Sequence, residues 1–155
     1  MINLIAGQLP LFWGTCNNQE LANLCWSFAN LKHPIATDLL VTHCEFFAKR
    51  CADSDLRSLS VIMHSFQELK SPLLDAHSQH QLFASVLVKR RSEIQKANVL
   101  DYSTLLLFVC KSDIQENTRA LLLESLIPKI PIHMPKIGSK GFGSMCYGLS
   151  FLPKD

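Results

Sequence analysis

The chain has 155 residues, of which 48% are hydrophobic and 18% are charged, and its formal net charge is +2. This length allows one ordinary domain with a sizeable core, and the composition excludes a disordered chain and argues against a membrane span. A surplus of two positive charges is too small for a polycation, so any nucleic-acid-binding surface must be local.

The first segment, residues 1–14, is apolar but contains no basic residue. Gln8 and Pro10 interrupt it, which is not the pattern of a secretory signal peptide. The first basic residue is Lys32, so the sequence as given also lacks the Arg-rich segment of an organelle transit peptide. We expect that such a leader has either been removed or never existed.

An internal repeat begins at Leu21. Residues 21–34, LANLCWSFANLKHP, align without gaps on residues 59–72, LSVIMHSFQELKSP, at an offset of 38 residues. Each copy has four apolar residues spaced 3, 4 and 3 apart, which places them on one face of an α-helix. They are Leu21, Leu24, Phe28 and Leu31 in the first copy, and Leu59, Ile62, Phe66 and Leu69 in the second. Each copy therefore predicts a helix, called helix A, which ends near Pro34 or Pro72 because proline cannot continue the hydrogen-bond pattern.

A second apolar-periodic stretch follows each proline and predicts a partner helix, called helix B. Its apolar residues are Leu39, Leu40, Cys44 and Phe47 in the first copy, and Leu82, Phe83, Val86 and Leu87 in the second. Both stretches end on basic residues, in FAKRC at 47–51 and LVKRRS at 87–92. The repeated unit is thus a helix hairpin of about 38 to 40 residues.

Two fainter copies follow. Tyr102, Leu105 and Val109 predict a third helix A, with a helix B over residues 119–130. A fourth helix A is predicted from the same spacing of Phe142, Met145, Leu149 and Leu152, with Pro153 just behind it. Gly138, Gly141, Gly143 and Gly148 weaken this helix, because each glycine costs about 1 kcal/mol in a helix interior. Residues 130–140 carry two prolines and a glycine and are expected to form an extended loop and hinge.

These units predict an all-α fold, an α-solenoid of stacked helix hairpins in a single domain over residues 1–155. The repeats cover residues 18–51, 56–92, 99–130 and an incomplete 140–155, or about three and a half units. One hairpin buries only one face by itself, so neighbours must stack to complete a core. We therefore expect another protein or RNA to cover the unfinished last unit.

The sequence ELANLCWSFANLKHP at residues 20–34 resembles helix A of the octatricopeptide and heptatricopeptide repeats. These repeats occur in organelle RNA-binding proteins, including the RAP-domain and FAST-kinase-like proteins. The resemblance is strongest over residues 20–34, weaker over 56–72 and weakest beyond Val99. It implies an α-solenoid that binds RNA in a mitochondrion or plastid without catalysis.

Two departures from this family shape the expected function: no C-terminal RAP domain is found, and the array is short for a protein that reads RNA sequence. They favour a structural subunit of a mitochondrial ribosome, in the matrix, that contacts ribosomal RNA and other subunits. The alternatives are a protein scaffold of another mitochondrial complex, favoured by the near-neutral charge, and an independent RNA stability or processing factor. Neither a membrane nor a small-molecule substrate nor a cofactor is expected.

Basic residues occupy equivalent places at the ends of two successive helices B. They are Lys49, Arg50, Lys89, Arg90 and Arg91. Stacked units would align them into a basic ridge that holds RNA phosphates and positions RNA without reading its sequence. The other interpretation is that these cations complement the dipole at the C-terminal end of their own helix.

Polar and aromatic residues lie between the apolar residues of helix A. The candidates for contact with bases are Asn23, Trp26, Ser27, Asn30, His64 and Ser65. Trp26 and His64 share one repeat position and are able to stack on unpaired bases. The alternative to base contact is different for the two kinds of residue. The two rings would pack against the neighbouring hairpin, and the polar residues would form a solvated face.

We expect neither a metal site nor catalysis. The six cysteines are scattered singly, as expected of reduced and mostly buried thiols, and His43, Cys44, Cys51, His77 and His80 do not form two close pairs at zinc-finger spacing. The glycine-rich residues 138–143 follow a proline-rich segment rather than a strand and lack the Gly-Lys-Ser/Thr of a phosphate-binding loop.

Overall fold

The computed structural model describes residues 7, 8, 10–69 and 75–152, and every regular element within them is helical. The main α-helices are α2 (Asn18–Leu31), α3 (Pro34–Thr42), α4 (Cys44–Ala52), α5 (Leu56–Glu68), α6 (Ala76–Lys89), α7 (Val99–Lys111), α8 (Glu116–Leu126), α9 (Ile130–His133) and α10 (Ser139–Leu149). Three 3₁₀ helices join them: η1 (Arg91–Lys96), η2 (Ile127–Lys129) and η3 (Met134–Lys136). None of the described helices is both long and apolar enough to cross a bilayer.

Short polar residues fix where several of these helices begin. The Asn17 side chain accepts from the Glu20 backbone N–H, and the Glu20 carboxylate accepts from the Asn17 backbone N–H, so α2 starts with a capping box. Asp55 caps α5 in a similar way through the Ser58 N–H, and Asn98 caps α7. These caps occur at the start of the predicted helices A of the first three units.

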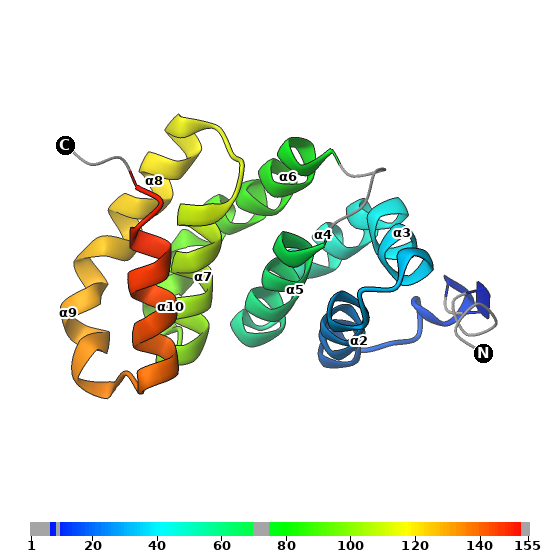
Figure 1. Ribbon diagram of the computed structural model, residues 1–155, viewed down its shortest axis with the longest axis horizontal. Coiled ribbons are helices and arrows are strands. Elements are labelled where there is room, and N and C mark those ends of the chain that lie inside the picture. The colour runs from blue at the N-terminus through cyan, green and yellow to red at the C-terminus, as the bar shows by residue number, and fades with distance from the viewer. Residues whose placement is uncertain (1–6, 9, 70–74, 153–155) are drawn as a thin grey trace.

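The helices pack in two rows (Figure 1). The A row consists of α2, α5, α7 and α10, each packed against the next, and the B row consists of α4, α6 and α8. The core lies between the rows, where the buried Phe66 ring of α5 lies 5.6 Å from Phe47 and 4.8 Å from Phe83, measured between ring centroids. The prediction of an all-helical chain is therefore confirmed for the described residues.

The first predicted helix B is two helices rather than one. His43 separates α3 from α4, and its backbone N–H bonds the carbonyl oxygens of Leu39 and Leu40. Its ring Nδ1 also lies 2.9 Å from the Leu39 oxygen. These contacts complete the end of α3 and start α4 in a new direction. Pro34 begins α3 at its first turn, where a missing N–H costs nothing. Its counterpart Pro72, like Pro153, lies outside the described residues.

The predicted extended loop at residues 130–140 is wrong over its first part. Residues 127–136 form the short helical turns η2, α9 and η3, and each turn has a proline at its first or second position. Proline is tolerated there because its fixed φ suits a helix start and its missing N–H would be unpaired in any case. A proline-rich sequence thus forms successive helix starts here.

The buried face of α10 also differs from the predicted one. Gly141, Met145 and Gly148 are buried, whereas Phe142 is 45% exposed. A Cβ atom on Gly148 would lie 3.1 Å from the Cα atom of Leu107 in α7. Gly148, which was expected only to weaken this helix, therefore lets α10 approach α7 closely.

Candidate nucleic-acid interface

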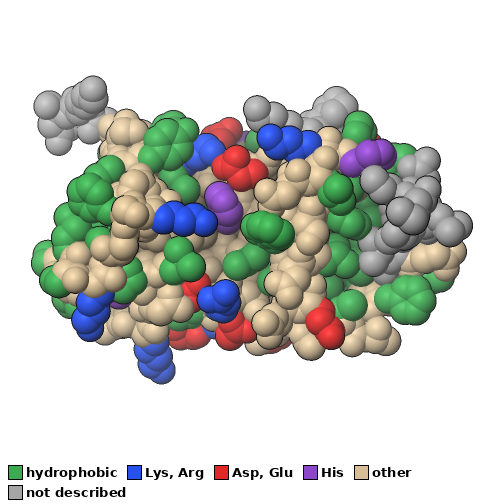
Figure 2. Space-filling view, turned by 60° about the horizontal axis from the view of Figure 1, so that its bottom comes forward, with side chains coloured by type: hydrophobic (Ala, Val, Ile, Leu, Met, Phe, Trp, Pro, Cys, Tyr) green, Lys and Arg blue, Asp and Glu red, His purple; other side chains and the backbone are tan. Residues whose placement is uncertain are grey.

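A groove of about 760 Å³ crosses the A row. It is bordered by α2, α3, α5, α7 and α10, so all four helices of the A row contribute to one surface. On the face shown in Figure 2, histidine, basic and acidic side chains gather near the centre between hydrophobic ones. The residues that line the groove are Trp26, Ala29, Asn30, Lys32, Pro34, Thr37, Asp38, His64, Ser65, Glu68, Leu69, Leu107, Lys111 and Tyr147.

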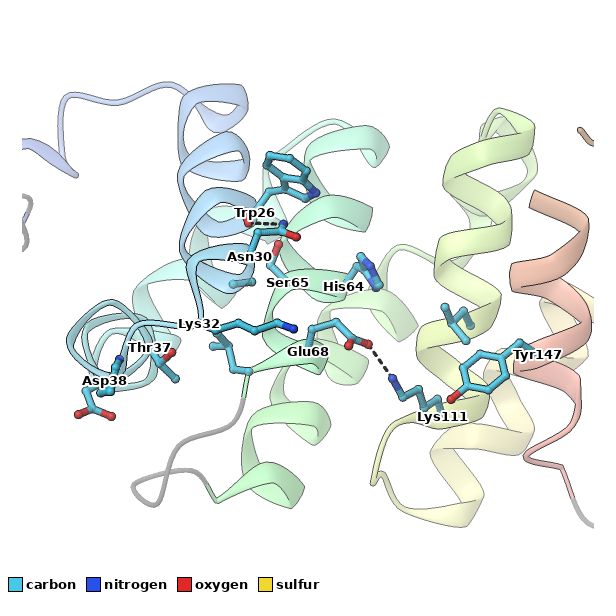
Figure 3. A pocket seen from close by; sticks show the side chains of 14 residues that line it. Trp26, Asn30, Lys32, Thr37, Asp38, His64, Ser65, Glu68, Lys111 and Tyr147 are labelled. Atoms are coloured by element: carbon cyan, nitrogen blue, oxygen red, sulfur yellow. Dashed lines mark hydrogen bonds and ion pairs between the residues drawn. The ribbon is translucent and has the colours of Figure 1, made fainter. Parts of the chain in front are cut away.

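One repeat position supplies a groove residue from each helix of the A row. Trp26, His64, Leu107 and Tyr147 each lie five residues after the first apolar residue of their predicted helix A, called the +5 position. Figure 3 shows Trp26, His64 and Tyr147 coming from three different helices of the row. Side chains at this position of the predicted repeat thus come from successive helices of the A row, and three of these four carry a ring.

A second position adds polar groups beside the first. Asn30, Glu68 and Lys111 lie nine residues after the first apolar residue, called the +9 position, and all three line the groove. The Lys111 Nζ lies 2.6 Å from the Glu68 Oε1, which joins α5 to α7 by an ion pair (Figure 3). The same Nζ lies 6.0 Å from the centre of the Tyr147 ring. The centre of the groove is therefore polar and contains both signs of charge.

The surroundings of the His64 ring favour its neutral form. Its side chain is half-buried, and its Nδ1 is buried without a hydrogen-bond partner among the described residues. Burial lowers the pKa of His64, the positive charges of Lys111 and Lys140 lower it further, and the Glu68 carboxylate opposes them. A neutral imidazole in this place offers a flat face and one hydrogen-bonding nitrogen.

The groove brings together four of the six predicted base-contact residues: Trp26, Asn30, His64 and Ser65. Trp26 is 55% exposed, so packing into the neighbouring hairpin does not explain it. The hydroxyl of Ser65 is buried and donates to the Val61 carbonyl, so it contributes little to the surface. Asn23 and Ser27 are exposed but do not line the groove.

None of the five predicted phosphate contacts lines the groove. Lys49, Lys89 and Arg91 are exposed. The Arg50 guanidinium donates to the Cys16 carbonyl oxygen at 2.7 Å and to the Asn18 side chain at 3.2 Å. These contacts tie the C-terminal half of α4 to the start of α2.

Arg90 also contacts the backbone of another helix. It donates to the carbonyl oxygen of Cys51, in the last turn of α4, at 2.8 Å, and it pairs with Glu93. The dipole interpretation placed such cations at the end of their own helix, whereas Arg90 caps a helix of the preceding unit. Arg50 and Arg90 of the expected basic ridge are thus used in contacts within the protein, whereas Lys49, Lys89 and Arg91 form no hydrogen bond or ion pair with the described residues.

Sequence reasoning missed Lys32, Lys111 and Tyr147. Extending the helix A register into the two faint copies would have found Lys111 at the +9 position and Tyr147 at the +5 position. Lys32 has a different signal, because it follows α2 with a left-handed backbone, φ 51°. That conformation ends the helix and starts the chain toward α3.

No protein-family model, curated protein or solved structure matches the chain. Within the described residues, no group of three or more His, Cys, Asp or Glu side chains is placed to hold a metal ion.

Proposed function

We propose that this chain is an α-solenoid of helix hairpins that binds unpaired RNA along the groove of its A row. In this proposal it acts without catalysis, as a structural subunit of a mitochondrial ribonucleoprotein, and the mitochondrial ribosome is the leading case. The observation that carries the RNA contact is the line of +5 residues, Trp26, His64, Leu107 and Tyr147, in one groove.

The spacing of these residues favours single-stranded over double-stranded RNA. Packed helices lie about 8–10 Å apart, whereas stacked bases are separated by about 3.4 Å. Bases resting on neighbouring +5 side chains would therefore be splayed apart rather than stacked on each other. Aromatic side chains bind splayed bases, and stacking on a ring tolerates any base.

The charges of the groove suit the same ligand. Lys32 and Lys111 line it, and Lys140 lies close enough to His64 to lower its pKa. Ammonium groups attract the phosphates that connect splayed bases. In the proposal the exposed Lys49, Lys89 and Arg91 hold further phosphates outside the groove and position the RNA on the protein.

The repeat organisation and the cellular setting are supported by different observations. The 38-residue offset, the caps at the start of α2, α5 and α7, and the two helix rows support stacked hairpins. The resemblance of residues 20–34 to organelle RNA-binding repeats supports the mitochondrial matrix. Ribosomal RNA and neighbouring ribosomal subunits would be the partners there.

Crosslinking in organelles tests the RNA contact and the setting together. Tagged chain is irradiated in intact mitochondria, and the lysate is fractionated on a gradient with and without ribonuclease. We expect the chain to sediment with a ribosomal subunit and to yield RNA adducts in peptides that contain Trp26, His64 or Tyr147. Adducts without cosedimentation would favour an independent RNA processing or stability factor, and the absence of adducts would refute the RNA contact.

A protein scaffold is the second candidate, and exposed apolar residues favour it. Ile132 and Met134 of the α9–η3 segment and Phe142 and Phe151 around α10 are all exposed. Figure 2 shows hydrophobic side chains at its left end, where α9 and α10 lie. Affinity purification would favour the scaffold if the same protein partners remained after complete ribonuclease digestion.

A further inference from the structure

The last predicted unit differs from the other three because both of its groove positions carry a ring. Its +5 residue is Tyr147 and its +9 residue is Phe151, whereas the +9 residue of each earlier unit is polar. Phe151 follows α10, and its backbone N–H bonds the Gly148 carbonyl oxygen, so the chain still coils there. Tyr147 and Phe151, four residues apart, are therefore neighbours on one side of this coil.

The two rings form a corner that is open to solvent. Their centroids lie 5.0 Å apart and their planes make an angle of 82°, so the edge of one ring meets the face of the other. Tyr147 is 52% exposed and Phe151 is 45% exposed. The ring that presents its edge keeps both of its faces outside this contact. The corner therefore offers ring surface on which a flat ligand can stack.

This corner continues the groove and is not a separate surface. Tyr147 lines the groove, and its ring projects from α10 toward Lys111 of α7 (Figure 3). The Lys111 Nζ lies 6.0 Å from the centre of that ring. Phe151, one turn after Tyr147, extends the series of groove rings past its last +5 residue.

Lys140 supplies a positive charge on the same side of α10. It lies seven residues before Tyr147, which is two helical turns, so the two side chains face the same way. Lys140 is exposed, and its charge lowers the pKa of His64 in α5, in agreement with a position beside the groove. Residues 125–152 contain three lysines and no aspartate or glutamate, so this part of the chain attracts a phosphate.

Two adjacent rings distinguish bases by their size. Stacking removes ring surface from water, and the fused rings of a purine bury more of it than the single ring of a pyrimidine. Phenylalanine has no hydrogen-bonding group, so it does not read the donors and acceptors on a base edge. The corner should therefore favour purines over pyrimidines through stacking area.

We infer that Tyr147 and Phe151 form a subsite for an unpaired purine at the α10 end of the groove, with Lys140 beside the phosphate of that nucleotide. Phe151 is then a specificity-determining residue. This inference rests on the proposed RNA-binding function and adds to it a site for one end of the strand. Trp26 lies in α2, at the opposite end of the A row, so the two ends of a bound strand meet different rings (Figure 1).

Short oligouridines that carry one 2-aminopurine test the inference. This purine is fluorescent, and stacking on an aromatic ring quenches it. The full chain is titrated into probes that carry it at the 5′ end, in the middle or at the 3′ end. We expect quenching at both ends of the bound strand. Phe151→Ala should restore the fluorescence at one end, and Trp26→Ala should restore it at the other.

Affinities measured by competition with unlabelled RNA give the base preference. Oligouridine with one adenine at the end assigned to Phe151 should bind about threefold more tightly than plain oligouridine. Phe151→Ala should remove this preference and weaken binding of the adenine-containing strand about fivefold. Phe151→Tyr keeps the ring and should retain both the preference and the affinity.

Phe142→Ala is the matched control. Phe142 is also a phenylalanine of the last unit and is also 45% exposed, but it lies five residues from Tyr147 and so faces another side of α10. A melting curve shows that each variant is folded. The inference is overturned if Phe151→Ala acts as Phe142→Ala does, or if adenine gives no advantage at either end, and the proposed function then still stands. Failure of the parent chain to bind any of the probes overturns both.

Discussion

The guanidinium of Arg90 donates a hydrogen bond of 2.8 Å to the carbonyl oxygen of Cys51, which lies 39 residues earlier in the chain. The Arg90 side chain is only 12% exposed, so this bond links the end of α6 to the last turn of α4 in a largely dry environment. Hydrogen bonds to charged groups contribute about 1.5–3 kcal/mol. The lower value of this range is expected for the Arg90 bond, because the Cys51 oxygen also accepts from the Ser54 hydroxyl and so keeps a partner without Arg90.

Arg90→Ala should therefore lower the free energy of unfolding by about 1.5 kcal/mol, measured by urea denaturation. The neighbouring Lys89 is exposed, so Lys89→Ala should stay within about 0.5 kcal/mol of the parent chain. Equal effects of the two substitutions would show that Arg90 acts through charge alone.

Two glycines of α10 should respond in opposite directions to a larger side chain. Gly148→Val places branched carbons against the Leu107 backbone and should destabilise the fold by about 1–3 kcal/mol. Gly143 is exposed, has open space around it and has no positive φ, so Gly143→Ala should stabilise α10 by about 0.5–1 kcal/mol. Thermal unfolding of both variants checks this. If Gly148→Val melted with the parent chain, the close approach of α10 to α7 would be disproved.

Trp26 should contribute to RNA affinity much more than to folding. Stacking on one aromatic side chain is worth about 1–3 kcal/mol per base, so Trp26→Ala should weaken binding of oligouridine roughly tenfold. Because the ring is more than half exposed, the melting temperature should change little. Phe142→Ala removes an exposed ring outside the groove and is the control, expected to bind as the parent chain does. Similar losses in both variants would argue against a specific stacking site.

Acidification below neutrality should destabilise the fold through histidines that are buried or half-buried. Burial lowers the pKa of His64, His80 and His133. The unfolded chain protonates these groups near pH 6.5, whereas the folded chain does so only at lower pH. The stability that these neutral histidines contribute is therefore fully present above about pH 6.5. It is lost as the pH falls through their folded-state pKa values. Burial raises the pKa of Asp101, which acts in the opposite direction in a lower pH range.

Urea midpoints at pH 7.5 and 5.5 measure this loss. His80→Gln removes one titrating group, and its amide oxygen can still accept from the Asp113 N–H that now bonds the His80 Nδ1 at 3.1 Å. The variant should lose less stability than the parent chain between the two pH values. An unchanged pH dependence would exclude His80 as a contributor.

The helices with a strong apolar period and a polar cap were predictable from sequence. The repeat fixed α2 and α5 through matching residues 38 positions apart, and Asn17 and Asp55 provide recognisable starts. The break between α3 and α4 at His43 was not predictable from sequence. Neither proline nor glycine marks it, and the contacts that end α3 involve backbone carbonyls. Residues 130–136 were misjudged because proline is equally suited to a loop and to the first turn of a helix.

The groove was predictable only in part. Trp26 and His64 were identified because their units align without gaps, but Leu107 and Tyr147 belong to copies whose register depends on a few apolar residues. The basic residues illustrate a different limit. A run such as Lys-Arg-Arg shows charge, yet whether a guanidinium faces solvent or the Cys51 carbonyl depends on how two units pack.

The helices of the A row do not all have the same number of neighbouring helices in the row. Both α5 and α7 are flanked on two sides by helices of the row, whereas α10 packs mainly on α7. In a chain where each unit contacts only its neighbours, opening proceeds more easily at a helix supported from one side. Amide protons of α5 and α7 should therefore exchange with solvent most slowly, and those of α10 early. The middle of the groove, between His64 and Lys111, would then remain assembled while the Tyr147 end opens and closes.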